Sequence, residues 1–522
     1  MFDTLIHGGD IVDGSGRDAF AGDLGIVGDR IVAIGDLQGA AAAQRLDASG
    51  LVVAPGFIDI HTHSDFTLLV DGSADSQICQ GVTTEVIGQC GFSAAPMGAR
   101  PDASQIFGHL EAGVALDWRS FGDYLDRLQQ ARPAVNVAAF VGHGALSRAA
   151  GEGGLAEMRR LAEQAFDDGA IGLSTGLEYW PGNDAPAHEI EAMAAVAARR
   201  GGLYGTHVRN RDVDCELGFA EAIRTARHAG ARLQISHIQP KFGAPAHAMA
   251  AALQQIDNAR RDGVDVAFDV IPHDWSHTVV VAMLPAWARE GGVQKTLARL
   301  RDPAQRERIK VNPRPIWRLV SERRWDRIVL LRSLANAELV GLDFASIGRL
   351  RGLDPHDAAL DLLVEEGPAF EQLMWTSRNF EDADICLCLQ QAQCGVMSDT
   401  LAVSRHGPLK DVIGSLSGYG WTARLLGHYA RDRGVLTLAQ AVARITVRPA
   451  ERLGLAGRGL LRAQGFADVV VFDPARVQDQ SSIAAPAVHP SGFVHVLVNG
   501  RPVVLDGVRN HERPGRVLRG AA

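Results

Sequence analysis

The sequence predicts an α/β protein built on an eight-stranded (β/α)8 barrel of the TIM type, with a small β-sandwich formed by the two ends of the chain. Three observations carry this prediction. Short apolar segments alternate with amphipathic helices from residue 52 onward, glycine-punctuated strands cluster at both ends, and ligand-type residues recur where the apolar segments end. Parallel strands with intervening helices close into a barrel whose strand ends meet on one rim.

Composition limits the kind of partner. The chain has 522 residues, with 46% hydrophobic and 22% charged residues and a formal net charge of −9. This length requires one large domain with a satellite, or two domains. No basic stripe is visible, so binding to nucleic acid or to a membrane surface is not expected. We expect a small-molecule substrate. The six cysteines are few and scattered, as in reduced proteins, and no leader or bilayer-spanning run is visible, so we expect a cytoplasmic protein.

The two ends of the chain have the same pattern of short strands separated by glycines. Residues 1–54 form the first part of the predicted β-sandwich, with short strands at residues 4–6, 10–12, 24–27 and 30–34. Residues 455–522 form the second part, with strands at residues 467–472, 494–498 and 502–505. Tight turns marked by glycine separate the strands, which is typical of antiparallel sheets. We therefore expect the two ends to pair with each other.

Residues 55–454 form the predicted barrel. Its eight strands are expected at residues 52–61, 83–88, 135–141, 170–177, 203–207, 232–237, 264–270 and 394–398. Amphipathic helices are expected between several of them, at residues 155–167, 189–200, 219–229 and 246–261. The segment of about 285–370, between strands seven and eight, is rich in Arg, Trp and Pro and too long for one crossover. It is predicted as an inserted lid or subdomain near the rim.

Residues that can ligate a metal lie at the ends of the predicted strands. His61 and His63 alternate at the end of strand one, so their side chains project to the same face. Further candidates follow strands two, five, six and eight: Cys90, His207, His237 and Asp399. Imidazole and thiolate are ligands suited to zinc, and a nearby carboxylate can take a proton from metal-activated water. The pattern predicts a zinc site on the carboxyl-terminal rim.

Other interpretations apply to each residue taken alone. A single histidine on a strand is more commonly a hydrogen-bonded core residue than a ligand, and this interpretation is kept for His143, His273 and His277. Cys90, framed by glycines, has the alternative of a buried thiol in a tight turn. Asp399 has the alternative of a helix N-cap. Recurrence of such residues on one rim favours the metal site.

The order of the motifs resembles the N-acyl-D-amino-acid deacylase (D-aminoacylase) branch of the amidohydrolase superfamily. The motifs are Gly-Phe-Ile-Asp-x-His-Thr-His at residues 56–63, Gly-Val-Thr-Thr at 81–84, Gly-x-Cys-Gly at 88–91, Thr-His-x-Arg-Asn at 206–210, Ser-His at 236–237 and Ser-Asp at 398–399. The resemblance spans nearly the whole chain, including residues 172–177 and 448–454. It implies hydrolysis of the amide bond of an N-acyl amino acid of the D series.

The resemblance also implies roles for the rim residues. Cys90, His207 and His237 are expected to hold a tightly bound zinc ion, and His61 and His63 a second, weaker position. Asp399 is expected to act as the general acid/base toward metal-activated water.

Lysine usage separates this chain from other branches of the superfamily. Many relatives bridge two metals with a carboxylated lysine at the end of strand four, and none of the four lysines of this chain lies there. Cys90 is therefore the expected bridging ligand. Glu178, where strand four ends, is an alternative bridging ligand, and its other interpretation is an ordinary rim carboxylate.

Substrate recognition is expected to differ from that of familiar members. Gln239 stands where they carry a lysine that helps to hold the substrate carboxylate, and Thr400 follows Asp399 in place of glycine. Arg209, Lys241 and Arg405 are candidates for binding a carboxylate instead, or are solvated rim charges. Alternative functions are hydrolysis of another C–N bond (in a D-dipeptide, a cyclic amide or a xenobiotic amide) and an inactive scaffold. The chain could form a homo-oligomer under any of these functions.

Overall fold

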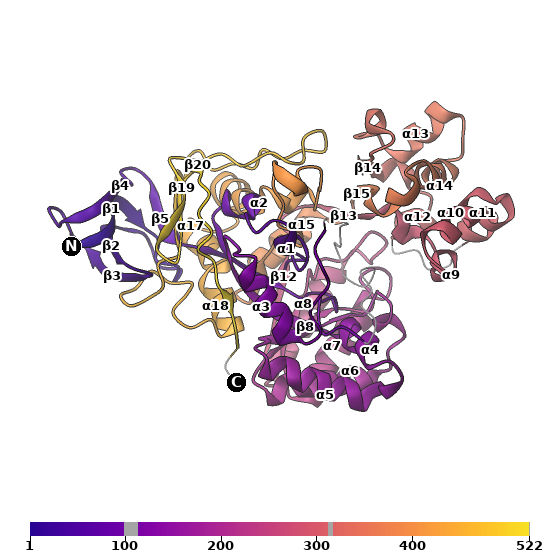
Figure 1. Ribbon diagram of the computed structural model, residues 1–522, viewed down its shortest axis with the longest axis horizontal. Coiled ribbons are helices and arrows are strands. Elements are labelled where there is room, and N and C mark those ends of the chain that lie inside the picture. Colours follow the sequence, from indigo (N-terminus) through magenta and orange to yellow (C-terminus); the bar gives the residue numbers. More distant parts are fainter. Residues whose placement is uncertain (99–112, 312–316, 521–522) are drawn as a thin grey trace.

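Parallel strands form a barrel at the centre of the molecule, with a sheet built from the chain ends on one side and an inserted subdomain on the other (Figure 1). The computed structural model describes residues 1–98, 113–311 and 317–520. Helices surround the barrel, and the inserted subdomain stands away from it at the upper right of the view. This arrangement confirms the predicted fold class.

The barrel strands follow one another in chain order, each parallel to the next. They are β6 (Phe57–Asp59), β7 (Val82–Ile87), β8 (Asn136–Gly142), β9 (Gly172–Gly176), β10 (Leu203–His207), β11 (Arg232–Ile235), β12 (Val266–Val270) and β16 (Cys394–Val396). A parallel bridge between Thr62 and Thr400, just beyond β6 and β16, closes the ring. All eight strands therefore end on the same rim.

The first predicted strand, residues 52–61, is two strands in the structure. β5 (Val52–Pro55) pairs with β1 (Phe2–Ile11) and β17 (Val469–Phe472) in the terminal sheet, whereas β6 belongs to the barrel. The break lies at Gly56, where an added Cβ would stand 2.2 Å from the Thr83 hydroxyl oxygen. The apolar run gave no sign of this break because both strands are fully buried.

Amphipathic helices cover the outside of the barrel where they were predicted. They are α5 (Gly154–Asp167), α6 (Ala187–Arg199), α7 (Cys215–Ala229) and α8 (Ala248–Arg261), and each packs against the next. In α6 the buried residues Ile190, Met193 and Ala197 recur at helical spacing and face the core. Burial of such stripes against the strands is the main force that holds the barrel together.

The two chain ends share one sheet, as predicted. Its order is β20-β19-β18-β17-β5-β1-β2-β3, with β4 (Ala42–Asp47) paired to β1. The remaining strands are β2 (Phe20–Val27), β3 (Arg30–Gly35), β18 (Phe493–Val498), β19 (Arg501–Leu505) and β20 (Val508–Arg509). Its core joins Ile6 and Ile26 from the N-terminal part with Val469 and Leu497 from the C-terminal part. Neither end could bury these side chains alone.

The insertion between β12 and β16 has a sheet and a core of its own. The antiparallel strands β13 (Trp275–Val279), β15 (Met374–Arg378) and β14 (Ile328–Arg332) are covered by helices that include α10 (Val293–Arg301), α11 (Pro303–Lys310), α13 (Phe344–Arg351) and α14 (Pro355–Glu365). The rings of Trp317 and Trp375 stack at 5.1 Å in its core. It extends on both sides of the predicted residues 285–370, because the strands that join it to the barrel lack the unusual composition of the middle.

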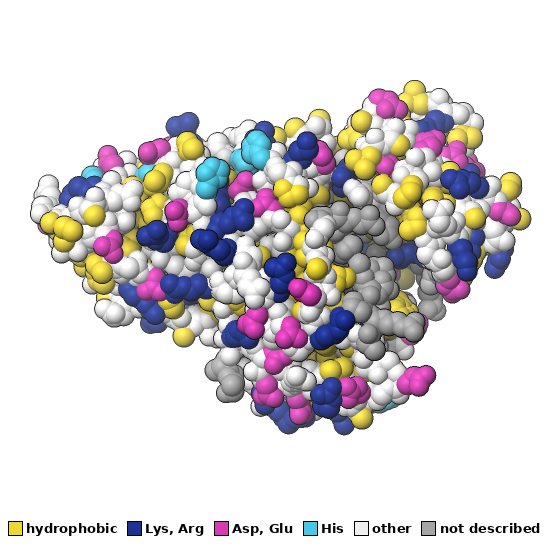
Figure 2. Space-filling view, in the orientation of Figure 1, with side chains coloured by type: hydrophobic (Ala, Val, Ile, Leu, Met, Phe, Trp, Pro, Cys, Tyr) yellow, Lys and Arg dark blue, Asp and Glu magenta, His cyan; other side chains and the backbone are white. Residues whose placement is uncertain are grey.

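Basic and acidic side chains are interspersed over the face drawn in Figure 2. In the described part of the chain, no helix is long and apolar enough to cross a membrane.

Candidate metal centre

The structure brings the predicted ligands together on the carboxyl-terminal rim. His61 lies two residues beyond β6, Cys90 three beyond β7, and His237 two beyond β11. His207 is the last residue of β10, and Asp399 lies three residues beyond β16. Residues up to 338 positions apart in sequence thus meet because parallel barrel strands all end on one side.

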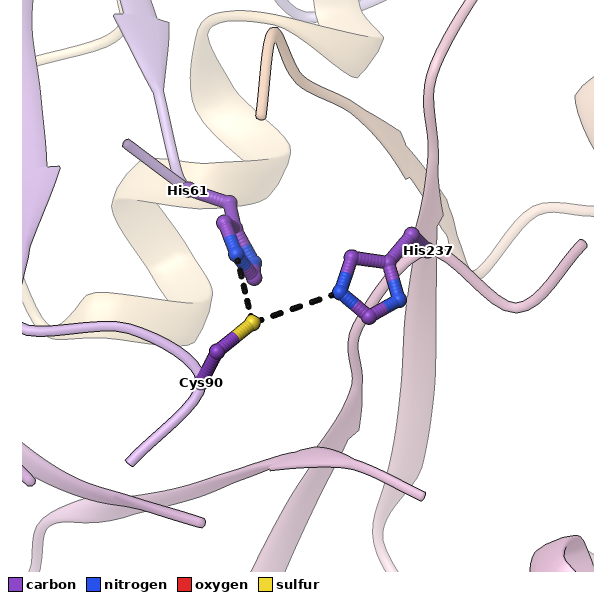
Figure 3. Close-up of side chains that lie close together, drawn as sticks. All are labelled: His61, Cys90 and His237. Carbon is purple, nitrogen blue, oxygen red and sulfur yellow. Dashed lines mark hydrogen bonds between the residues drawn. The ribbon is translucent and has the colours of Figure 1, made fainter. Parts of the chain in front are cut away.

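The thiol of Cys90 lies at the centre of this group. Its Sγ is 3.3 Å from Nε2 of His61, 3.3 Å from Nε2 of His237 and 3.6 Å from Nδ1 of His207. Figure 3 shows the His61 and His237 rings both directed at the sulfur. Tetrahedral zinc, with bonds of about 2.3 Å to sulfur and about 2.0–2.1 Å to nitrogen, separates neighbouring S and N ligands by about 3.5 Å. The donor atoms of Cys90, His61 and His237 lie within 4.8 Å of one another and are therefore spaced to hold a zinc ion, whereas His207 is outside this group.

A second group shares His61 with the first. Oδ1 of Asp399 is 3.4 Å from Nε2 of His61 and 3.2 Å from Nε2 of His63. The ligand atoms of His61, His63 and Asp399 lie within 4.8 Å of one another, as do those of His61, Cys90 and His237. The two groups adjoin through His61, so the site has room for two neighbouring metal positions.

Exposure distinguishes Asp399 from the other residues of the site. Its side chain is 21% exposed, whereas that of His61 is 1% and that of His63 is 8% exposed. The imidazoles are therefore enclosed, and the carboxylate faces the open side of the rim, from which a substrate would arrive.

Three of the site residues have left-handed backbone conformations. The φ angles are +53° at Cys90, +36° at His237 and +52° at Asp399. Such angles are uncommon for residues other than glycine, and surrounding structure must hold them. The main-chain N–H of His237 donates to Oδ1 of Asp269 at 2.6 Å, and that of Asp399 to the carbonyl of His61 at 3.1 Å. Strained main chain thus aims these side chains.

Glu178 orients one of the histidines. Its Oε2 lies 2.8 Å from Nε2 of His207, and both of its oxygens accept from Nζ of Lys241, at 2.7 and 2.8 Å. A carboxylate on Nε2–H leaves the Nδ1 lone pair of His207 facing Cys90, which is the tautomer that a metal ligand needs. Glu178 lies on the side of the ring away from Cys90, so this geometry favours an orienting role over the bridging role considered from the sequence.

Burial keeps the histidines neutral. It lowers the pKa of His61 to about 3 and that of His207 to about 4, and it lowers the pKa of His237 well below its ordinary value. Neutral imidazoles keep the lone pair that a metal requires. Burial also raises the pKa of the Cys90 thiol, which therefore carries its proton until a metal ion displaces it. A metal ion bound by this thiol would displace that proton.

Asp399 is ionised despite its surroundings. Burial raises the pKa of its carboxyl, but the hydrogen bond from His63 is the strongest of the contacts that hold this pKa well below the ordinary value. An ionised carboxylate at this position can accept a proton.

Two buried aspartates support the rim from below. Oδ1 of Asp59 accepts from the main-chain N–H groups of His61, at 3.3 Å, and Ser398, at 3.1 Å, so it ties strand one to strand eight. Asp269 holds His237 in the same manner. Burial raises the pKa of both carboxyls to about 7. Asp269 lies at the C-terminal end of β12, the seventh barrel strand, so the criterion that identified the histidines also applies to it.

The three cations proposed to bind a carboxylate have different surroundings. Arg209 donates to both oxygens of Glu221 and to the carbonyls of residues 182, 183 and 185, so its guanidinium is fully used. Lys241 is paired with Glu178. Arg405 is exposed, and its charge acts on Cys79, Tyr419 and His489 rather than on the metal ligands. The geometry thus gives Arg209 and Lys241 structural partners and leaves Arg405 outside the group.

Several residues near the centre were not identified from the sequence. Arg211 is 7% exposed, and its Nη1 donates to the carbonyl of His237 at 2.8 Å. The ring of Tyr179 lies 4.7 Å from that of His207, and the ring of Phe92 lies 5.3 Å from that of Tyr179. These residues follow strand ends, where the direction of a side chain depends on tertiary contacts and not on periodicity.

The histidines set aside as core residues have separate environments. Nε2 of His143 is bonded to Glu189 Oε1 at 2.8 Å, and His273 lies 3.4 Å from Asp479. His277, on β13 of the insertion, is half-buried. Burial lowers its pKa to about 4, with smaller effects from the charges of Asp399 and His63. His277 thus lies within electrostatic range of Asp399 and His63.

Comparison with known proteins agrees with the motifs. The family model described as Amidohydrolase family matches residues 44–319 and 393–504. The N-acyl-D-glutamate deacylase of Alcaligenes xylosoxydans xylosoxydans is 35% identical over 530 residues, covering 99% of this chain and 96% of that protein. The D-aminoacylase of the same organism is 35% identical over 532 residues, covering 99% and 97%.

A solved structure is similar over the same length. The crystal structure of an N-acyl-D-glutamate deacylase from Bordetella bronchiseptica, complexed with zinc and a phosphonate inhibitor, matches with a TM-score of 0.81 at 33% identity. The match covers 99% of each chain. The resemblance seen in the motifs is confirmed, and this chain belongs to the amidohydrolase family.

Proposed function

We propose that this chain is a zinc-dependent hydrolase that cleaves the amide bond of N-acyl-D-amino acids. The observation that carries the proposal is the Cys90 thiol surrounded by three imidazoles, with a partly exposed carboxylate, Asp399, beside them. Relatives that match over nearly the whole chain are named for the deacylation of N-acyl-D-glutamate and for D-aminoacylase activity.

The proposed function includes two positions for zinc. Cys90, His207 and His237 would hold the tighter ion, and His61 and His63 a weaker one, with Cys90 between them. The donor set, one soft thiolate and neutral imidazoles, is one that zinc prefers. A zinc ion held there would polarise the amide carbonyl and lower the pKa of water bound to it.

Asp399 would move the proton. Its ionised carboxylate lies on the open side of the rim and is held by main-chain contacts, so it can take a proton from the attacking water and deliver it to the departing amine. His63, at 3.2 Å, fixes the carboxylate through its Nε2. The Asp399 carboxylate would carry out both proton transfers, so no second acid is required in the site.

A hydrolysis screen tests the proposal. Zinc-loaded protein is incubated with N-acetyl-D-amino acids, their L-enantiomers, D-dipeptides, cyclic amides and aryl amides, and release of the free amine is measured. We expect turnover of the D-series N-acyl compounds and loss of turnover after chelation, with recovery on adding zinc. Activity confined to the other amides would assign a different C–N bond. Protein that contains no zinc and gains no activity from any divalent ion would indicate a scaffold.

The proposed cellular location is the cytoplasm. All six cysteines are free thiols, which is the state favoured by a reducing compartment. Fractionation of the source cells, followed by immunodetection of the chain, tests this.

A further inference from the structure

Arg211 is a buried cation that forms no ion pair with a described residue, and the carboxylates of Glu178 and Asp269 act on it only at longer range. Its residue is 7% exposed, and its guanidinium makes one hydrogen bond within the described residues, from Nη1 to the carbonyl of His237 at 2.8 Å. Its Nε is buried and has no hydrogen-bond partner there. No carboxylate of the described residues forms an ion pair with it. An unpaired buried charge is costly, so the position favours an anion that arrives from outside.

The neighbouring cations differ from Arg211 in this respect. Arg209, two residues earlier, is paired with Glu221 at 3.0 Å, and Lys241 is paired with Glu178 at 2.7 Å. The main chain of Lys241 donates to the carbonyl of Arg211 at 2.6 Å, which fixes the backbone of the loop. Among these three cations, Arg211 alone has no carboxylate partner in the described residues, and its Nε remains available to a ligand.

A second donor lies on the adjacent segment. The guanidinium carbon of Arg211 lies 5.8 Å from the ring centre of Phe380, so the segment after β15 packs beside it. Its neighbour Asn379 is 5% exposed; its side-chain oxygen accepts from the main-chain N–H of Phe242 at 3.0 Å, and its Nδ2 has no hydrogen-bond partner in the described chain. Two buried donors, on segments that pack beside each other, are thus without acceptors among the described residues.

This region adjoins the metal centre. Arg211 bonds directly to the backbone of His237, whose ring contacts Cys90. The side chain at position 239, where a lysine would have supplied a charge, is occupied elsewhere: the Gln239 amide bonds to both the carbonyl and the N–H of Ile271, at 2.7 and 3.0 Å. A positive charge is instead present on a different loop, the one that follows β10, where Arg211 lies.

We infer that Arg211, assisted by Asn379, binds the free carboxylate of the substrate and so restricts the enzyme to N-acyl amino acids with that group unmodified. This inference rests on the proposed function and adds the residue that selects the substrate class. A carboxylate has two oxygens in one plane, which match the Nε and Nη2 edge of a guanidinium. The contact pairs the buried charge and positions the amide over the metal ligands.

Matched substrates and variants test the inference. The ratio of kcat/KM for an N-acetyl-D-amino acid over its methyl ester is measured for the wild type, Arg211→Gln, Arg211→Lys and Arg405→Gln. We expect the wild type to prefer the acid, and Arg211→Gln to lose about 10- to 100-fold in kcat/KM for the acid with little change for the ester, as for a lost charge-assisted hydrogen bond. Arg211→Lys should keep part of the preference, and Arg405→Gln, altered at an exposed site, all of it.

Two further readouts separate the possible failures. Zinc content and circular dichroism of Arg211→Gln should match the wild type, so that a fold defect is recognised, and Arg211→Lys serves if the glutamine variant is unstable. An unchanged acid-over-ester ratio in the variants would overturn the inference while the proposed function stands. If no N-acyl-D-amino acid is hydrolysed, the proposed function fails. Calorimetric binding of the N-acetyl-D-amino acid then decides: binding lost in Arg211→Gln supports the carboxylate site, and equal or no binding overturns it.

Discussion

The main-chain N–H of Asp399 donates to the carbonyl of His61 at 3.1 Å, and the carboxylate of the same aspartate lies 3.4 Å from the imidazole Nε2 of His61. The first of these bonds lies where β6 and β16 close the barrel, next to the bridge between Thr62 and Thr400. The proton-accepting group is therefore fixed relative to the metal ligands by the closure of the fold, and not only by its own side-chain contacts.

Asp399→Asn should separate chemistry from metal binding. Asparagine tolerates the left-handed backbone of this position, so the fold and the main-chain bond to His61 should persist. Because the amide cannot accept the proton, we expect kcat to fall by about a hundred- to ten-thousand-fold. Zinc measured by atomic emission should remain near that of the wild type. Loss of zinc together with activity would instead make Asp399 a ligand.

Zinc occupancy should depend more on Cys90 than on His61. Cys90 contacts three imidazoles, whereas His61 contacts the thiol and Asp399 at the junction of the two groups. We expect Cys90→Ala to lose most of the bound zinc and His61→Ala to keep substantial zinc, measured after equal dialysis. Exposed His247→Ala is the control. Equal losses in the two variants would place His61 in the tight site, as its grouping with Cys90 and His237 also allows.

Rim residues could be predicted from the sequence where they continue a strand. His207 ends β10 and follows an apolar run, so its place on the rim follows from the barrel alone. Arg209 and Arg211 lie beyond the strand, where the period of two no longer applies. Contacts with Glu221, twelve residues later, turn Arg209 away, and Arg211 takes the place beside His237. No local pattern distinguishes these two arginines.

Contacts between side chains on different barrel loops could not be predicted from the sequence either. Lys241 and Glu178 are 63 positions apart, on the loops after strands six and four, and only the curvature of the barrel brings them together. The division of the first predicted strand at Gly56 has a similar cause. β5 and β6 are both fully buried, and the partners that separate them, β17 and β7, are distant in sequence.

Breaking the Glu178–Lys241 pair should affect both stability and zinc. The two side chains are 10% and 6% exposed, so removing one leaves a buried charge without its partner. For Lys241→Met we expect a loss of about 3 kcal/mol in the free energy of unfolding, measured by urea denaturation of zinc-loaded protein. For Glu178→Gln we expect zinc affinity to fall by about 10- to 100-fold, because His207 loses the carboxylate that fixes its tautomer.

The double variant provides the control for that pair. In Glu178→Gln with Lys241→Met neither charge remains, so the loss of stability should be smaller than the sum of the two single losses. The zinc defect of Glu178→Gln should persist, since it arises at His207. Additive effects on stability would show that the two side chains do not interact.

Glu85, on β7, should make the protein less stable as pH rises. It is fully buried, its Oε1 accepts from the Ser64 hydroxyl at 3.2 Å, and its Oε2 has no hydrogen-bond partner in the described part of the chain. Burial raises the pKa of its carboxyl well above the ordinary value, and Asp59 and Asp65 raise it further. The folded protein therefore holds this proton more tightly than the unfolded chain. The resulting stability is complete below the unfolded pKa of about 4.3 and is lost as pH rises through the folded pKa.

Glu85→Gln tests this sign directly, because glutamine has nearly the same shape and cannot ionise. We expect the variant to be close to the wild type in free energy of unfolding at pH 5 and to gain on it at higher pH, by at most about 1.4 kcal/mol per pH unit. Urea unfolding of zinc-loaded protein at pH 5, 7 and 9 measures the difference, with the half-exposed Glu163→Gln as the control. Parallel pH profiles for wild type and Glu85→Gln would mean that Glu85 takes up no proton on folding.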